Sequence, residues 1–381
     1  MANMMDYLDW RGDLTFAASE FNDVDNLLLA QLIYVDFEGI VPPPESGGDI
    51  RLDEASDLFW QQHSEEEILA LVSMTKSAPF VMKKMAESER FRDARLSKYL
   101  NDISDEEQSQ FSVMCVRLSD GSLFVTYSGT DNTIVGWREN FNMGYLETTP
   151  GQMKSVRYLN RIAQEEPGLI RVGGHSKGGN LSVYAAVHCL PEIQERITAV
   201  YSNDGPGFRA AVVESDAYQR MIPKIKSILP ESSIVGMLLV HQDSYEVVKS
   251  SETGVQQHDA MSWEVLGTSF VYVEKVAAQS ILLDETVKTW LGHLDMEQRH
   301  QIVETAFSML EEAGIHTVDD FYHSRWETIQ KLMKAKNGLA PETQQLFSEA
   351  FKLLWKTGNE MVRRNVKQAV QEHRGTAKPE I

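Results

Sequence analysis

The chain has 381 residues, of which 36 are Lys or Arg and 56 are Asp or Glu, so its formal net charge is −20. This length suits one large domain or one domain with an appendage, and an apolar content of 42% is typical of a chain that folds around a core. The strong negative charge argues against nucleic acid as a partner, because a phosphate backbone would be repelled from most of the surface.

The first hundred residues are predicted to be mainly helical. A helix is expected over residues 22–37, since Asn and Asp side chains that can cap a helix precede an apolar stripe at helical spacing. Another helix is expected to open at Ser64, which is followed by glutamates that the N-terminal end of a helix dipole favours. Further helical patterns continue to about Leu100.

The pattern changes at Gln110 to strands alternating with helices. Strands are expected over residues 111–118 and 122–127, and Asp120-Gly121 between them is typical of a tight hairpin. The following segments are then expected: helices over residues 150–165 and 179–190, and strands over residues 169–172, 197–202 and 234–241. We therefore predict an α/β fold with a mostly parallel sheet and helices on both faces.

Beyond residue 284 the strand pattern disappears. Helical spacing continues over residues 286–312, 318–336 and 341–374, with breaks at Gly314, Gly338 and Pro341. We predict two parts: residues 1–283 as an α/β domain that includes the N-terminal helices, and residues 284–381 as a helical appendage. Residues 352–378 are rich in Lys and Arg, so this helix is expected either to expose a solvated face or to contact an anionic membrane surface.

The remaining composition points to a cytoplasmic protein. No stretch approaches the roughly 18 apolar residues of a membrane span, and the first residues lack the basic and apolar regions of a signal peptide. Two cysteines, Cys115 and Cys189, are too few for a disulfide framework, and we expect both to be ordinary buried thiols in a reducing compartment.

The segment that carries chemistry is Gly174-His175-Ser176-Lys177-Gly178, a G-x-S-x-G directly after an apolar strand and directly before a helix. This context is typical of a nucleophile elbow, in which a sharp strand-to-helix turn holds a serine in a strained backbone conformation. Glycines flank the serine because the crowded turn leaves no room for side chains. We predict Ser176 as a nucleophile; the alternative is a glycine-rich turn that binds an anion or simply packs.

A serine nucleophile requires a base and an orienting acid, which in this type of fold follow it in the order Ser, Asp or Glu, His. His258 lies in a polar loop after the expected strands, and we predict it as the base. Asp243 follows the strand expected over residues 234–241 and is the preferred acid. Asp204, which follows the preceding strand, is the alternative, although its Asp-Gly-Pro-Gly setting also suits a turn that shapes the floor of a pocket.

Two backbone N–H groups are predicted to form an oxyanion hole. One belongs to Lys177, directly after the nucleophile at the start of a helix. The other is expected from Thr130, in the loop after the strand over residues 122–127, where Gly129 frees the backbone. An ordinary turn at a strand end is the alternative for this loop. The predicted chemistry requires no metal and no organic cofactor, and no cluster of His, Cys and Asp suggests one.

These segments resemble two groups of proteins. Ser128-Gly-Thr-Asp with Gly136-Trp137, followed by Gly174-His-Ser-Lys-Gly-Gly, is similar to the core of the class-three lipases. The chain more closely resembles the Mbeg1-like family of bacterial α/β-hydrolases, through the same elbow and through Tyr7-Leu-Asp-Trp-Arg-Gly-Asp-Leu-Thr-Phe, Phe21-Asn-Asp-Val-Asp-Asn, Ser202-Asn-Asp-Gly-Pro-Gly-Phe and Gln257-His-Asp-Ala-Met-Ser-Trp.

The resemblance covers most of residues 5–375 and implies an α/β-hydrolase fold. It implies Ser176 as nucleophile and His258 as base, and Thr130 with Lys177 as oxyanion donors. At two positions the sequence departs from the lipases: Ser128 stands where they have an arginine, and Lys177 where they have a leucine. Lys177 is expected either to bind an anionic group of the substrate or to point into solvent, and both departures weaken the case for triglycerides.

We therefore expect a serine hydrolase that cleaves carboxylic esters, of small molecules or lipids, through a Ser-His-Asp triad and an acyl-enzyme. Acyl transfer to a nucleophile other than water would use the same residues, so an acyltransferase is one alternative. A non-catalytic binding protein on a hydrolase fold is another. The helical appendage and the N-terminal helices are expected to cap the pocket and select the acyl chain.

Overall fold

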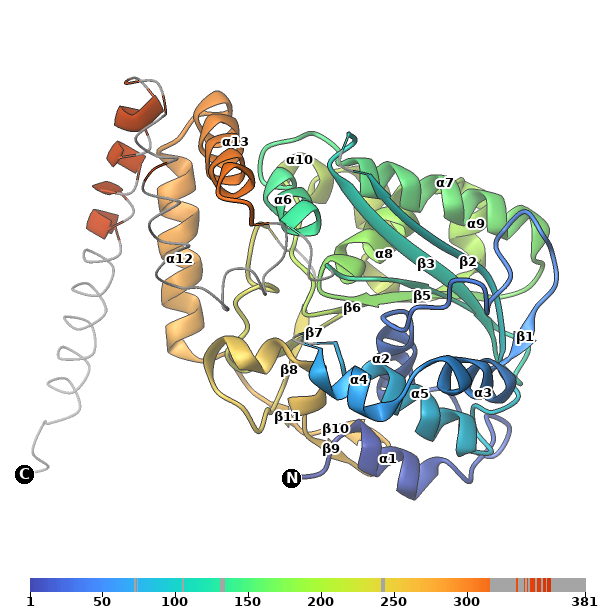
Figure 1. Cartoon of the computed structure of the whole chain (residues 1–381). Coiled ribbons are helices and arrows are strands. Elements are labelled where there is room, and N and C mark those ends of the chain that lie inside the picture. The colour runs from blue at the N-terminus through green and yellow to red at the C-terminus, as the bar shows by residue number, and fades with distance from the viewer. Residues whose placement is uncertain are drawn as a thin grey trace, which may run out of the picture.

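The computed structural model describes residues 1–315 except 72, 74, 105, 131–133 and 241–243, and beyond them residues 334, 339, 341, 343–346, 348–350, 352–353 and 355–357. A nine-stranded sheet runs through this part of the chain (Figure 1). Its strands, in spatial order, are β1 (Ile50–Arg51), β2 (Arg95–Ser104), β3 (Ser109–Arg117), β4 (Leu123–Tyr127), β5 (Ile170–His175), β6 (Ile197–Asn203), β7 (Ile225–Pro230), β8 (Tyr245–Val248) and β11 (Tyr272–Val273).

The direction of the strands changes at β4. Strands β4 to β8 run parallel to one another, whereas β1 to β4 pair antiparallel and β11 pairs antiparallel with β8. A separate two-stranded sheet consists of β9 (Val265–Leu266) and β10 (Ser269–Phe270). Because β4 to β8 are parallel, their carboxyl ends meet at one edge of the sheet, where the functional loops of α/β proteins gather.

Helices cover both faces of the sheet (Figure 1). On one face lie the N-terminal helices α1 (Met4–Arg11), α2 (Asp23–Leu32), α3 (Leu52–Gln62), α4 (Glu65–Ala70) and α5 (Ala78–Glu87). On the other face lie α7 (Pro150–Glu165), α8 (Lys177–His188) and α9 (Pro191–Arg196), with the short α10 (Ala210–Val213) and α11 (Asp216–Met221) nearby. At one end of the sheet stand α6 (Ile134–Asn142), α12 (Ala278–Gly292) and α13 (Met296–Glu312).

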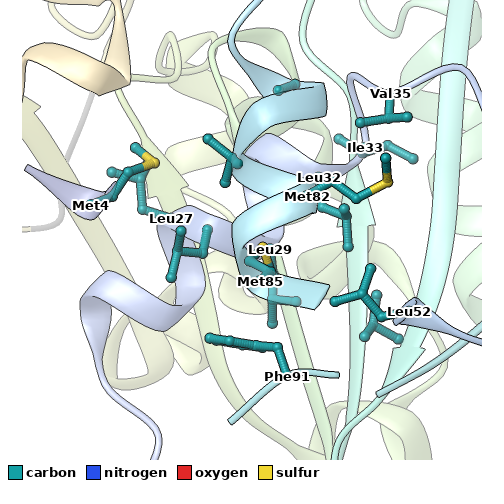
Figure 2. Packing of buried hydrophobic residues seen from close by; sticks show 14 of the residues in the cluster. Met4, Leu27, Leu29, Leu32, Ile33, Val35, Leu52, Met82, Met85 and Phe91 are labelled. Atoms are coloured by element: carbon teal, nitrogen blue, oxygen red, sulfur yellow. The ribbon is translucent and has the colours of Figure 1, made fainter. Parts of the chain in front are cut away.

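Each face of the sheet has its own hydrophobic core, and β3 shows why. Val113 to Val116 form a continuous apolar stretch in which every second side chain points to the same face, so Met114 and Val116 join the core under the N-terminal helices. Val113 and Cys115 point the other way, into the core shared with α7 and α8. Figure 2 shows the first core, where side chains of α2 and α5 interlock over the sheet. The architecture is the α/β-hydrolase-like fold predicted from the sequence.

Local signals identified several elements correctly. The predicted helix over residues 150–165 is α7, and the predicted hairpin joins β3 to β4. Asn22 and Ser64 cap α2 and α4 with side-chain hydrogen bonds to backbone N–H groups of the first turn. The two thiols, Cys115 and Cys189, are free and buried, as predicted.

Two predicted elements were wrong. The helical pattern assigned up to Leu100 gives way to β2, where the pairing with β3 is irregular between Ser97 and Leu100 and Lys98 adopts a positive φ of 57°. This bulge interrupts the alternation that identifies a strand in a sequence. The strand expected over residues 234–241 is not formed: the described residues 234–240 are turns and bends, and only Val240 makes a single bridge, to Phe208.

The C-terminal part is helical as far as it is described. The continuous helical spacing from residue 286 to residue 312 is divided between α12 and α13, which are separated by His293, Leu294 and Asp295. The domain boundary predicted between residues 283 and 284 falls inside α12. Most of the predicted basic segment, residues 352–378, lies outside the described residues. No described helix is both long enough and apolar enough to cross a membrane.

A buried ion pair fixes α2 beneath the sheet. The guanidinium of Arg90 donates to both carboxylate oxygens of Asp25, at 2.7 and 2.5 Å, and both side chains are completely buried. Tyr7 donates a third hydrogen bond to Asp25, at 2.7 Å. The next residue, Asn26, exchanges hydrogen bonds with the amide of Asn203, at the carboxyl end of β6. A helix of the N-terminal segment is therefore attached to the edge at which the candidate site lies.

Candidate active site

Ser176 lies at a sharp turn between β5 and α8. Its backbone has φ 57° and ψ −130°, a strained combination for a residue with a side chain, as a nucleophile elbow requires. The flanking glycines are needed here: a Cβ on Gly174 would lie 2.4 Å from the backbone of Gly178, and a Cβ on Gly178 would lie 2.1 Å from the carbonyl oxygen of Tyr127. The predicted elbow is therefore present as a backbone geometry.

Asp204 lies beside Ser176 because of the register of the sheet. His175 of β5 is paired with Asn203 of β6, so the next residues along these parallel strands, Ser176 and Asp204, leave the sheet at the same level. The N–H of Ser176 donates to the carbonyl of Asn203 at 2.9 Å, which ties the two strand ends together. The acid and the serine are thus held by adjacent strands.

The imidazole of His258 is hydrogen-bonded to Asp204. His258 ends a short 3₁₀ turn (Gly254–His258), and its Nδ1 lies 2.5 Å from Oδ2 of Asp204. With Nδ1–H donated to the carboxylate, Nε2 has a free lone pair that can accept a proton. The carboxylate is completely buried and the imidazole is 16% exposed, so His258 is accessible from outside while Asp204 is not.

The environment of Asp204 keeps it ionised. Burial alone would raise its pKa, but hydrogen bonds from His258 and Ser233 and the charge of His258 lower the pKa below its ordinary value. Oδ1 accepts from the hydroxyl of Ser233 and, at 3.1 Å, from the N–H of Gly236. Both oxygens of the carboxylate are therefore oriented by donors, with Oδ2 directed at His258.

Of the two acids considered from the sequence, the one hydrogen-bonded to His258 is therefore the alternative, Asp204. The preferred candidate, Asp243, lies outside the described residues. The preference for Asp243 rested on a strand over residues 234–241, which the structure does not form. The strand whose end carries the carboxylate is β6.

His175 anchors the segment that carries His258. Its Nε2 lies 2.9 Å from the backbone carbonyl oxygen of His258, and the two imidazole rings are 4.6 Å apart between centroids. On the other side of the ring, Nδ1 lies 3.2 Å from the hydroxyl of Tyr34. Burial, together with the positive charge of a protonated His258, lowers the pKa of His175 to about 3, so it is neutral at pH 7. In this state Nε2–H donates to the carbonyl and Nδ1 accepts from Tyr34.

This low pKa predicts a pH-dependent contribution of His175 to stability. Between its ordinary pKa of 6.5 and its pKa of about 3 in the folded protein, the unfolded chain binds a proton that the folded chain does not. The free energy of unfolding should therefore fall by about 1.4 kcal/mol for each pH unit of acidification in that range. Urea unfolding at pH 7, 6, 5 and 4 should show a steeper loss for the wild type than for His175→Gln. Parallel curves for the two proteins would contradict this assignment.

The loop after β4 lies against the elbow. A Cβ on Gly129 would be 3.1 Å from the Cβ of Ser176 and 2.7 Å from the carbonyl oxygen of His175, so only a glycine fits this approach. The N–H of Gly129 donates to the Tyr34 hydroxyl at 3.1 Å. Thr130 follows directly. Within the part of the chain that the structure describes, the N–H groups of Thr130 and Lys177 have no hydrogen-bond acceptor.

The side chain of Lys177 neither reaches a substrate position nor points into solvent, the two possibilities considered from the sequence. It is completely buried, and its ammonium group forms an ion pair with Glu139 of α6 at 2.9 Å. It also donates to the backbone carbonyl and the side-chain oxygen of Gln110, at 2.5 and 2.6 Å. The contacts use all three donors of the ammonium group, so Lys177 offers a ligand only its backbone N–H.

Sequence reasoning missed three residues whose side chains bond to the segments that flank Ser176. Tyr34, Glu139 and Asn140 contact the loops on either side of Ser176, yet none was singled out. The only available signal was Gly136-Trp-Arg-Glu-Asn directly after the oxyanion loop, where charged and amide side chains follow a predicted functional turn. No group of three or more His, Cys, Asp or Glu side chains suited to a metal occurs among the described residues.

Comparisons with known proteins give one family and several solved structures. Residues 85–308 match the family described as Mbeg1-like. The crystal structure of M37 lipase is 18% identical, with a TM-score of 0.32, and the match covers 46% of this chain and 70% of that chain. A native propeptide complex of Rhizomucor miehei lipase is 14% identical, with a TM-score of 0.31, covering 51% of this chain and 66% of that chain. No curated protein matches the sequence.

Proposed function

The chain belongs to the Mbeg1-like family, and we propose that it is a serine hydrolase that cleaves carboxylic esters with Ser176 as nucleophile, His258 as general base and Asp204 as orienting acid. The observation that carries this proposal is the hydrogen bond from His258 to the buried carboxylate of Asp204, beside a serine in the strained backbone of an elbow. A structural role alone would require neither the strain nor an accessible imidazole on a buried carboxylate.

In the proposed reaction, Nε2 of His258 takes the proton of the Ser176 hydroxyl as its oxygen attacks the acyl carbon. Asp204 holds the imidazole in the correct tautomer and stabilises the imidazolium that forms. The carbonyl oxygen becomes an oxyanion, which the N–H groups of Thr130 and Lys177 stabilise. The C–O bond to the leaving alcohol then breaks, the alcohol takes the proton from His258, and an acyl ester on Ser176 remains.

Water completes the cycle. His258 takes a proton from a water molecule as the water attacks the acyl ester, and a second oxyanion forms in the same hole. Its collapse breaks the bond to the Ser176 oxygen, which recovers the proton from His258, and the carboxylic acid is released. The steps need no group beyond the side chains and backbone already described. An alcohol or amine in place of this water would make the same site an acyltransferase.

Labelling with a fluorophosphonate tests this proposal directly. The probe phosphonylates serines whose hydroxyl is activated by a base, so we expect a single adduct on the peptide that contains Ser176, located by mass spectrometry. Heat-denatured protein should remain unlabelled, since activation depends on the folded arrangement of Asp204, His258 and Ser176. Folded wild-type protein that does not react with the probe would overturn the assignment as a serine hydrolase. Acyl esters of graded chain length would then define the substrate range.

A further inference from the structure

The two residues proposed as oxyanion donors, Thr130 and Lys177, have side chains held by consecutive residues of one helix. We propose that Glu139 and Asn140 of α6 are positioning residues for the oxyanion hole: Glu139 fixes Lys177, and Asn140 fixes Thr130. This inference rests on the proposed function, because it assigns a role to residues behind that site. Neither residue touches a reacting atom; each acts through the residue whose N–H would bind the oxyanion.

Glu139 fixes the side chain of Lys177 through a buried ion pair. Glu139 is completely buried, and Oε2 accepts from the ammonium group of Lys177 at 2.9 Å and from the N–H of Gln110 at 3.2 Å. Oε1 accepts from the N–H of Gly151, in the first turn of α7, at 2.7 Å. A Cβ on Gly151 would lie 2.4 Å from this oxygen, so the contact requires a glycine. One carboxylate therefore connects the elbow helix, β3 and α7, and it neutralises the buried ammonium group.

Asn140 fixes the side chain of Thr130 through a hydrogen bond. Its Nδ2 donates to the hydroxyl oxygen of Thr130 at 2.6 Å, across the loop between β4 and α6. Adjacent residues of a helix point about 100° apart, so Glu139 and Asn140 can reach two different loops from one place on the backbone. α6 itself is supported from outside, since Arg138 forms ion pairs with Glu304 and Glu311 of α13. Figure 1 shows α13 beside α6 at this end of the sheet.

The consequence for catalysis follows from how an oxyanion hole works. Its donors lower the barrier only if they already point at the position that the oxyanion will occupy, because reorientation during the reaction would cost free energy. A Thr130 released from Asn140 would still bind a ground-state ester but would donate less well to the tetrahedral oxyanion. Loss of the anchor should therefore lower kcat and leave KM nearly unchanged.

The experiment compares Asn140→Ala, Thr130→Val and the double variant, with p-nitrophenyl butanoate hydrolysis and the rate of fluorophosphonate labelling as readouts. We expect Asn140→Ala to lower kcat by about tenfold or more, with KM within about twofold of the wild type. The double variant should be no slower than the slower single variant, since both changes break the same contact. Asn140→Asp should not recover the rate: the Thr130 hydroxyl can donate to the new carboxylate, but the negative charge beside the hole opposes the developing oxyanion.

Asn142→Ala is the matched control. Asn142 is another asparagine of α6, more deeply buried than Asn140, but it bonds to Gln108 and Tyr145 rather than to Thr130 or Lys177. We expect its replacement to lower stability without selectively lowering kcat, so thermal unfolding of every variant is measured beside the kinetics. A comparable fall in kcat for Asn142→Ala, or no fall for Asn140→Ala in a folded protein, would overturn the positioning role.

Glu139→Gln tests the other anchor. Glutamine keeps the length of the side chain but leaves the buried ammonium group of Lys177 without its counter-ion. We expect a lower kcat and a lower thermal stability, whereas Glu139→Gln combined with Lys177→Met should recover stability but not kcat. Recovery of both would show that the ion pair serves folding alone. Failure of the proposed function can be distinguished from failure of the positioning role alone. In the first case folded wild-type protein would hydrolyse no ester and take up no probe, which would also overturn the positioning role; in the second the wild type would be active and only the variants would differ from the expectation.

Discussion

Replacing Ser176 with alanine is expected to lower kcat for ester hydrolysis by about a millionfold, to the rate that binding and the oxyanion hole alone can supply. The serine hydroxyl is the only group of the protein that forms a bond to the acyl carbon in the proposed reaction. Because alanine keeps the Cβ that the crowded turn already accommodates, the variant should fold with nearly unchanged thermal stability. Steady-state hydrolysis of a p-nitrophenyl ester measures the loss of kcat, and fluorophosphonate labelling measures the loss of the reactive hydroxyl.

Ser182→Ala is the control for this variant. Ser182 also lies on α8 and is completely buried, but its hydroxyl proton is shared between the carbonyl oxygens of Gly179 and Tyr201, each 2.8 Å away, and it belongs to the packing of the helix on β6. Its loss should cost stability and leave labelling at Ser176 intact. Hydrolysis that persisted in Ser176→Ala at more than about a thousandth of the wild-type rate would mean that another residue is the nucleophile.

Replacing Asp204 with asparagine is expected to lower kcat by about 10⁴-fold. The asparagine side chain keeps the shape of the carboxylate, but its NH₂ group cannot accept the Nδ1–H of His258. The imidazole would then carry its proton on Nε2 and could no longer take one from Ser176. Asp243→Asn serves as the comparison, and we expect its kcat to remain close to that of the wild type.

The same pair of variants distinguishes catalysis from folding. The Asp204 carboxylate also accepts from Ser233 and Gly236, so some loss of stability is expected in Asp204→Asn, and hydrolysis is measured well below the temperature at which the variant unfolds. A large fall in kcat in Asp243→Asn, with Asp204→Asn still active, would assign the acid to Asp243 instead.

The sequence predicted those features that depend on neighbouring residues. The elbow around Ser176 is one run of glycines between an apolar strand and a helix, so its geometry follows from sterics within a few residues. The same is true of the caps at Asn22 and Ser64 and of the hairpin at Asp120-Gly121. Such signals persist whatever the rest of the chain does.

Features that depend on distant pairing could not be predicted in the same way. The hydrogen bond between Asp204 and His258 joins residues that are 54 positions apart in the chain. Asp204 reaches this position because the register of β5 against β6 places it beside Ser176. The strand over residues 234–241 was predicted from apolar content alone, and the preference for Asp243 depended on it. The ion pair of Lys177 is another feature that depends on distant pairing. Its partner Glu139 is 38 residues earlier in the chain, and no local sequence pattern predicts the contact.

The contact between α6 and α13 bears on where this protein could be shortened. Arg138 is only 14% exposed, and the carboxylates that neutralise it, Glu304 and Glu311, both belong to α13. Phe141 of α6 packs against Phe307 of the same helix, with 5.8 Å between ring centroids. In a fragment that ends at residue 283, the guanidinium of Arg138 would lose both carboxylate partners and the ring of Phe141 would lose its contact with Phe307. A fragment that keeps these contacts must include α13, which ends at Glu312.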